Sequence, residues 1–157
     1  MENNKVVWSE GLFLRPQHLQ QQERYLERFV ELRAGSLRPY TWGFSELELE
    51  TDLLAIGKLG IKRARGVFPD GTPFDMPGDD PLPLALDVND NWRDQTVFLT
   101  LPLRSPAQPD SGRPEAPAEK LFRYRVRETE VRDASGSVDG LTVLEVGGLN
   151  SRLLPQS

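Results

Sequence analysis

The sequence predicts an all-β fold, a β-sandwich with one amphipathic helix at its N-terminal end. Two patterns support this class. Residues 16–34 carry apolar side chains at steps of three and four, which is the spacing of one helix face. Residues 41–154 instead form about seven short segments separated by Gly, Pro and Asp, which is typical of a sandwich rather than of a parallel α/β sheet. The 157 residues fit a single domain.

Residues 1–15 form an apolar N-terminal arm with neither a helical nor a strand period. Its apolar side chains are Val6, Val7, Trp8, Leu12, Phe13 and Leu14. Such a concentration of apolar groups has to be buried somewhere. Two interpretations stay open: the arm pairs into the protein's own sandwich, or it docks on another chain with Trp8 and Phe13 as aromatic anchors.

The helix is predicted over residues 16–34. Proline is tolerated at its first turn, where the missing N–H of Pro16 would be unpaired in any case. Gly35 is placed to end the helix in a left-handed conformation that only glycine adopts without strain. We expect the apolar stripe to pack on the protein's own sheet rather than on a partner; its members are Leu19, Tyr25, Leu26, Phe29, Val30 and Leu32.

The strands are predicted at 41–50, 59–68, 74–76, 82–88, 95–104, 121–131, 141–146 and 149–154. The alternation slips at Ser45–Glu46, which suggests a bulge. Pro69-Asp70-Gly71-Thr72 has the composition of a tight turn. Pro83 makes 82–88 an edge or merely extended segment. Residues 105–118 contain four prolines, and we expect them to form a mobile loop.

The composition excludes several functions. The chain has no cysteine, so disulfides, thiolate metal sites and cysteine nucleophiles are ruled out. Its net charge of −5 argues against a nucleic-acid-binding protein. The first residues show no secretory signal, and no stretch approaches the roughly 20 apolar residues that span a bilayer. We therefore expect a cytoplasmic chain without direct membrane insertion.

No constellation of residues predicts catalysis, a metal site or a cofactor. The single histidine, His18, lies among glutamines and is expected to be a polar helix-face residue rather than a general base. Carboxylate pairs such as Asp79–Asp80 follow from the acidic composition, and the loop 87–94 would hold a cation only weakly. There is no phosphate-binding glycine motif. A hydrolase would need a nucleophile that the chain does not display.

Two further features are open to a binding role. Arg123, Arg125 and Arg127 alternate along one predicted strand, which we interpret as a solvated face rather than a recognition surface. Trp42 and Trp92 are the aromatic residues that would stack on sugars if the chain were a carbohydrate-binding β-sandwich module, which is the alternative function.

Four segments resemble one known family. They are Val7–Tyr25 (VWSEGLFLRPQHLQQQERY), Tyr40–Phe44 (YTWGF), Gly66–Phe74 (GVFPDGTPF) and Leu149–Leu154 (LNSRLL). The first is similar to the N-terminal signature of TssK, the trimeric baseplate protein of bacterial type VI secretion systems. The four segments bracket the chain, so the resemblance covers all of it.

This resemblance implies that the chain corresponds to the N-terminal shoulder of a longer protein, a β-sandwich similar to the shoulder of tailed-phage receptor-binding proteins. It implies a non-enzymatic structural adaptor, without cofactor, at the cytoplasmic baseplate docked on the inner membrane complex. The implied partners are the TssF–TssG wedge and other TssK copies. The resemblance covers only the shoulder, so we do not expect this chain to make the family's contacts with TssL and TssM, which belong to a head domain, or to include the neck helices of the family's trimer.

The partner-binding residues are expected within the first matching segment. They are Val7, Trp8, Leu12, Phe13, Leu14, Arg15, His18, Gln21, Gln22 and Tyr25.

Overall fold

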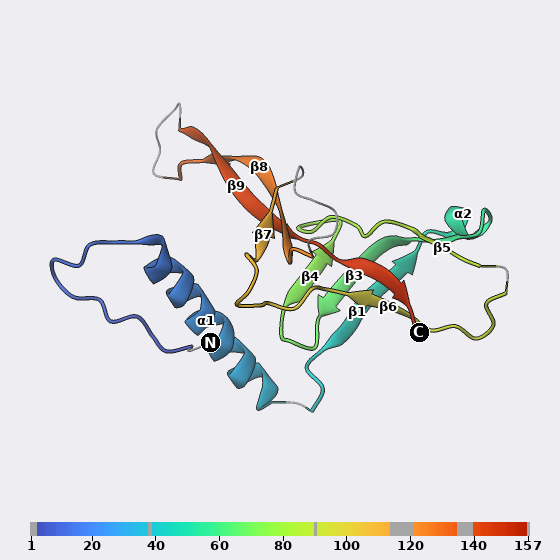
Figure 1. Ribbon diagram of the computed structural model, residues 1–157, viewed down its shortest axis with the longest axis horizontal. Coiled ribbons are helices and arrows are strands. Elements are labelled where there is room, and N and C mark those ends of the chain that lie inside the picture. The colour runs from blue at the N-terminus through green and yellow to red at the C-terminus, as the bar shows by residue number, and fades with distance from the viewer. Residues whose placement is uncertain (1–2, 38, 90, 114–120, 135–139, 157) are drawn as a thin grey trace. The chain divides into compact units, whose positions relative to one another are not determined.

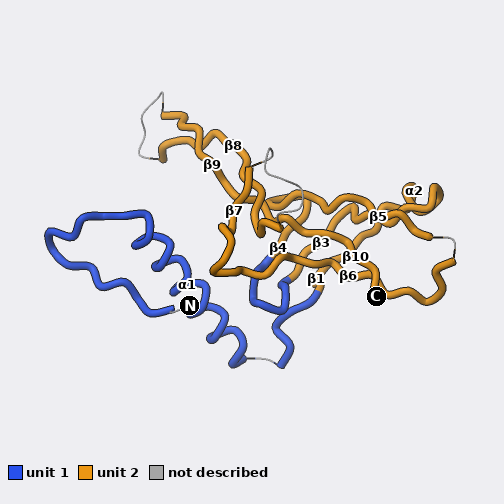
Figure 2. Tube along the Cα trace, viewed as in Figure 1, with its two compact units in different colours: residues 1–43, 67–73 blue, residues 44–66, 74–157 orange. Residues whose placement is uncertain are grey.

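The computed structural model describes residues 3–37, 39–89, 91–113, 121–134 and 140–156 (Figure 1). The chain divides into two compact units (Figure 2). Unit 1 consists of residues 1–43 and 67–73, and unit 2 of residues 44–66 and 74–157. Unit 1 contains the helix and the arm that precedes it, whereas unit 2 contains nearly all the strands.

The helix of unit 1, α1, spans Pro16–Gly35, which confirms the predicted helix and its proline at the first turn. The predicted ending is wrong. Gly35 is the last helical residue, and Ser36 caps the helix with an ordinary φ of −77°. The Ser36 hydroxyl donates to the carbonyl of Arg33 at 2.8 Å, so the last turn is satisfied without a left-handed glycine.

No side chain of α1 is buried. The apolar stripe that we expected to pack on the protein's own sheet therefore lies exposed, from Leu19 at one end to Leu32 at the other, apart from the half-buried Tyr25. Tyr25 and Phe29 stack on each other with ring centroids 6.1 Å apart, and the guanidinium of Arg33 lies 5.4 Å from the Phe29 ring centroid. Contacts along the helix itself thus cover only part of the stripe.

Residues 67–73 of unit 1 form the predicted turn. The amide of Phe68 donates to the carbonyl of Thr72 at 2.8 Å, and the amide of Thr72 donates to the Asp70 carboxylate at 3.1 Å. Gly71 has a φ of +86°, which favours glycine at this position. A Cβ on Gly71 would lie 3.0 Å from the Glu31 side chain, so the turn lies directly against α1.

Unit 2 is built from short strands. Their bounds are β1 Gly43–Leu49, β2 Lys58–Leu59, β3 Ile61–Val67, β4 Pro73–Met76, β5 Leu86–Asp87, β6 Val97–Thr100, β7 Ser111–Gly112, β8 Tyr124–Arg132, β9 Leu141–Leu149 and β10 Arg152–Pro155. They form two three-stranded sheets, β1-β3-β4 and β7-β8-β9, and two pairs, β10-β6 and β2-β5, among the described residues. This confirms a mostly-strand fold with one N-terminal helix.

The longest ladder is the antiparallel hairpin of β8 and β9. It runs from Tyr124 opposite Leu149 to Arg132 opposite Leu141. The parallel strand β7 adds to one end of β8, where Ser111 lies opposite Tyr124. In the two-stranded sheet β10-β6, Arg152 lies opposite Thr100. The hairpin is the part of unit 2 with the most regular pairing.

Three elements differ from the predictions. The short helix α2, Thr51–Leu54, was not predicted, because four residues are too few to show a helical period. In the segment predicted as a strand at 82–88, only Leu86–Asp87 pairs, since Pro81 and Pro83 have no N–H to donate. The strand β7 lies in the loop 105–118, of which residues 114–118 are outside the described part. The bulge at Ser45–Glu46 stays a prediction.

The core of unit 2 is small. Its buried apolar side chains are Ile61, Ala64, Phe74, Met76, Leu149 and Leu153. Met76 of β4 has no exposed surface, and its sulfur lies 3.9 Å from the hydroxyl of Ser151, between β9 and β10. Phe44 and Phe74 meet edge to face, with ring centroids 5.7 Å apart. The core thus joins β3 and β4 to the segment that links β9 and β10.

The row of arginines is only partly a solvated face. Arg125 and Arg127 are exposed, as predicted, whereas Arg123 is buried, which corrects the prediction for that residue. Arg123 is only 3% exposed, and it donates to the carbonyl of Pro102 at 2.8 Å. Arg125 donates to the Asn150 amide oxygen at 2.7 Å, and Arg127 to the carbonyl of Asp79 at 3.1 Å. Burial of a charged side chain is costly unless hydrogen bonds replace its lost hydration, as the Pro102 carbonyl does for Arg123, and strand alternation alone does not reveal such a partner.

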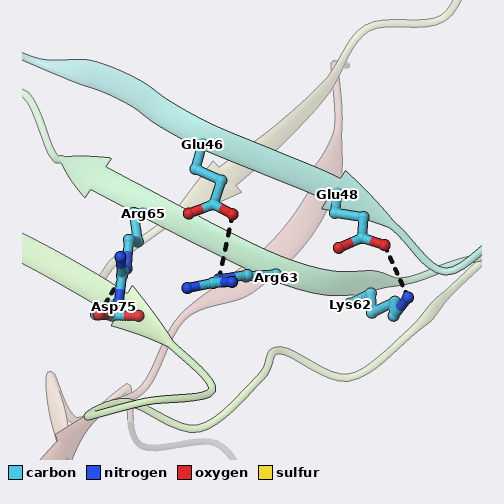
Figure 3. Close-up of polar contacts among 6 residues, drawn as sticks. All are labelled: Glu46, Glu48, Lys62, Arg63, Arg65 and Asp75. Carbon is cyan, nitrogen blue, oxygen red and sulfur yellow. Dashed lines mark hydrogen bonds and ion pairs between the residues drawn. The ribbon is translucent and has the colours of Figure 1, made fainter.

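Three ion pairs cross the sheet β1-β3-β4 (Figure 3). Figure 3 shows Glu46 and Glu48 of β1 facing Arg63 and Lys62 of β3, with oxygen–nitrogen distances of 3.2 and 2.7 Å. Arg65 donates from Nε to Asp75 of β4 at 2.7 Å, and this hydrogen bond lowers the pKa of Asp75. The first two pairs are exposed, so each contributes little stability.

The Arg65–Asp75 pair makes the free energy of unfolding depend on pH in the acidic range. Because the pKa of Asp75 is lower in the folded state, its contribution is present above the ordinary aspartate value of about 3.9 and is lost as the pH falls through the folded value. We expect Asp75→Asn to lower the free energy of unfolding at pH 7, and the gap to wild type to narrow as the pH falls below about 3.9, so that it is smaller at pH 3 than at pH 7. Urea titrations at both pH values measure this. Asp87→Asn, at a carboxylate that is 83% exposed, is the control, and an Asp75→Asn gap as large at pH 3 as at pH 7 contradicts the assignment.

Candidate partner-binding site

The N-terminal arm, residues 3–15, reverses direction at a turn. The amide of Leu12 donates to the carbonyl of Ser9 at 3.2 Å. Gly11 within this turn has a φ of +78°, which is strained for any residue with a Cβ. Figure 1 shows the arm starting beside α1, running outward, and returning to the first residue of the helix. The arm is therefore a loop rather than a free tail.

Two side chains of α1 hold the ends of this loop. His18 Nδ1 accepts a hydrogen bond from the backbone N–H of Arg15 at 3.0 Å, while the N–H of His18 donates to the Arg15 carbonyl at 2.9 Å. This reciprocal arrangement resembles a capping box, in which a side chain three residues into the helix satisfies the N-cap amide. The far end is held by Gln21, whose Nε2 donates to the carbonyl of Asn4 at 2.8 Å.

Arg24 fixes the orientation of the Gln21 amide. The Nε and Nη2 groups of Arg24 donate to Gln21 Oε1 at 3.1 and 2.8 Å. With its oxygen occupied in this way, the Gln21 amide directs its nitrogen toward Asn4. We call His18 and Gln21 the two clasps of the arm.

Between the clasps, the arm exposes its large apolar side chains. Val7 is 82% exposed, Phe13 79% and Trp8 50%, and Leu12 and Leu14 are also exposed. Val6 alone among the apolar residues of the arm is buried. The rings of Trp8 and His18 lie 6.2 Å apart, and a shallow hollow beside them is lined by Leu12, Phe13, Arg15, Gln17 and His18. The arm thus gathers apolar surface around the start of α1.

The structure places the residues expected to bind a partner in one part of unit 1. Val7, Trp8, Leu12, Phe13 and Leu14 form the exposed loop, His18 and Gln21 are the clasps, and Arg15 supplies the backbone amide that His18 holds. Gln22 and Tyr25 are half-buried further along α1. Their role in binding stays a prediction.

Two structural residues of the site were missed from the sequence. Asn4 supplies the carbonyl that Gln21 holds, and Gly11 allows the turn at the tip. Gly11 could have been found, because Gly at the third position of a Ser-Glu-Gly-Leu segment is typical of a turn that needs positive φ. The Asn4 contact involves only a backbone carbonyl, so no residue type signals it.

The described part of the chain also bears on three other possibilities: a metal site, the carbohydrate-binding alternative with its tryptophans, and a membrane-spanning helix. No group of three or more His, Asp or Glu side chains could hold a metal ion there. Trp42 is exposed in unit 1, whereas Trp92 is half-buried in unit 2. Neither helix of the described residues has both the length and the hydrophobicity of a membrane-spanning segment.

A family model described as bacterial type VI secretion, with EvfL, ImpJ and VasE among its members, matches residues 18–157. A curated protein of Pseudomonas aeruginosa, named as the type VI secretion system baseplate component TssK1, is 48% identical over 154 residues. That match covers 98% of this chain and 34% of the relative. The chain therefore spans about a third of the length of the curated relative.

Solved structures agree. A crystal structure of TssK superimposes with a TM-score of 0.89 at 39% identity, covering 99% of this chain and 35% of that one. A chain in a cryo-electron microscopy structure of the TssK–TssF–TssG baseplate subcomplex gives a TM-score of 0.86 at 26% identity, covering 99% and 51%. The fold of the described chain is therefore the fold of the corresponding part of these proteins.

Proposed function

The chain belongs to the TssK family of type VI secretion baseplate proteins, and from this membership we propose that it is a structural adaptor that binds TssF–TssG through its N-terminal arm and α1. A related chain is part of a solved TssK–TssF–TssG subcomplex, which supports the choice of partner. The proposal concerns this chain alone, because it spans only about a third of its curated relative.

One observation supports the N-terminal arm as the binding surface. The arm holds five exposed large apolar side chains within eight residues, from Val7 to Leu14. Contiguous exposed apolar surface on a protein commonly marks an interface. Two of the five are aromatic, and large aromatic side chains are enriched among residues that dominate binding energy.

The proposal also includes the absence of catalysis, the domain organisation, the location and the oligomeric state. The adaptor acts without catalysis, as one shoulder domain comprising residues 1–157, in the cytoplasm at the baseplate docked on the inner membrane complex. In the full-length protein it is held in a trimer of TssK copies. The matches to TssK proteins give the carbohydrate-binding alternative no support.

Light scattering tests whether the chain binds at all. The mass of the 157-residue chain is measured alone and then mixed with co-purified TssF–TssG. We expect a new species whose mass is the sum of the TssF–TssG complex and one or more copies of the chain. Elution of the two components at unchanged masses, at concentrations of tens of micromolar, would contradict the proposed function.

A further inference from the structure

We infer that the arm binds as a preformed closed loop, with His18 and Gln21 as positioning residues, and that its partner surface is an apolar hollow rather than a free strand edge. This inference rests on the proposed function. It assigns the two side chains to holding the loop, while the exposed apolar residues between them make the contact.

The clasps fix both ends of the loop on one rigid element. His18 holds the amide of Arg15, and Gln21 holds the carbonyl of Asn4, one helical turn further along α1. A flexible segment loses conformational entropy when it docks, and this opposes binding. A loop already closed in the free protein has lost most of that entropy before the partner arrives, so the clasps strengthen binding without touching the partner.

The same geometry argues against addition of a strand. An added strand needs a continuous extended run whose alternate N–H and C=O groups are free to pair. Here the backbone reverses at the turn between Ser9 and Leu12, and the carbonyl of Asn4 and the amide of Arg15 are already bonded. Only short limbs remain on either side of the turn. The side chains of Val7 and Phe13, about four-fifths exposed, are the groups that the loop offers to a partner.

Substitutions of His18 test whether this residue acts by holding the arm in place or by contacting TssF–TssG itself. Leucine at this position removes the acceptor for the Arg15 amide, whereas glutamine restores one, since glutamine is a usual residue at this position of a capping box. We expect His18→Leu to weaken binding to TssF–TssG about fivefold, if the cost of opening the loop equals the stability that a typical helix cap contributes. His18→Gln should bind within about twofold of wild type, with Kd measured by biolayer interferometry.

Amide hydrogen exchange measures directly whether the loop is closed in the free chain. Residues 4–15 should exchange faster in His18→Leu and in Gln21→Leu than in wild type, and His18→Gln should restore the slow exchange. If exchange is unchanged in both leucine variants, or if His18→Gln fails to restore binding, the positioning role is wrong.

A pair of glycine substitutions provides a matched test of the turn. Gly11→Ala strains the loop tip, where φ is +78°, while Gly35→Ala makes the same chemical change at the end of α1 without a positive φ. We expect Gly11→Ala to weaken binding several-fold and Gly35→Ala to leave it unchanged. Equal affinities for Gly11→Ala and wild type would contradict a preformed loop.

The results distinguish this inference from the function on which it rests. If removal of the arm abolishes binding but His18→Leu, Gln21→Leu and Gly11→Ala bind as wild type does, the inference fails and the proposed function stands. If the wild-type chain does not bind TssF–TssG, both fail. If the leucine variants bind weakly and His18→Gln binds normally, the inference is supported.

Discussion

Removal of residues 3–15 is expected to abolish binding of the chain to TssF–TssG. Truncation of one buried aromatic anchor commonly costs about 2 kcal/mol, or roughly 30-fold in Kd. The arm carries two such residues, Trp8 and Phe13, together with three exposed aliphatic ones. Loss of all five should therefore weaken binding by more than a thousandfold, beyond what co-purification detects.

The measurement is co-purification of the truncated chain with tagged TssF–TssG, together with far-ultraviolet circular dichroism. The β signal should persist, because all the strands of the described residues lie outside the deleted ones. Trp8→Ala should on its own reduce affinity by about 2 kcal/mol. Leu103→Ala, which truncates an apolar residue in unit 2 that is 79% exposed, is the control and should bind normally. Retained binding of the truncated chain would place the interface elsewhere.

Met76→Ala is expected to have the largest effect on stability. Met76 has no exposed surface and lies where β4 meets the segment between β9 and β10. Replacement of a buried methionine by alanine typically costs about 2–5 kcal/mol, because the removed atoms leave a cavity that the surroundings fill only partly. In a core of so few buried side chains, this is a large share of the total of about 5–15 kcal/mol available to a typical domain.

Urea unfolding followed by circular dichroism measures the loss as a lower midpoint at unchanged slope. Leu84→Ala truncates a side chain that is 80% exposed and should change the free energy of unfolding by less than about 0.5 kcal/mol. A Met76→Ala variant as stable as the Leu84→Ala control would show that the core lies elsewhere.

Local patterns predicted most of the fold. The helical period and Pro16 placed α1, and Pro69-Asp70-Gly71-Thr72 placed the turn between β3 and β4. The predictions failed where the local sequence does not determine the structure. Gly35 was expected to end the helix, but Ser36 provides a cap of its own. Arg123 was expected on a solvated face, but it is buried because the Pro102 carbonyl, distant in sequence, accepts its hydrogen bond.

The sequence predicted which residues make up the candidate site, but it did not predict the conformation of the arm. The apolar arm and its aromatic residues were evident, whereas the closure of the loop depends on single contacts between Gln21 and Asn4 and between His18 and Arg15. The His18 contact lies within the range of a capping box, although histidine is not the usual residue there. The Gln21 contact spans 17 residues and reaches a backbone carbonyl, so no sequence period reports it.

The central claim is that the apolar arm is covered by another protein when the baseplate assembles. A photoreactive benzophenone side chain at position 13, in place of Phe13, tests this claim in the assembled complex with TssF and TssG. The account predicts a covalent adduct with TssF or TssG, and no such adduct from the same group at position 103. Adducts formed only within the chain itself, at a yield unaffected by TssF–TssG, would contradict it.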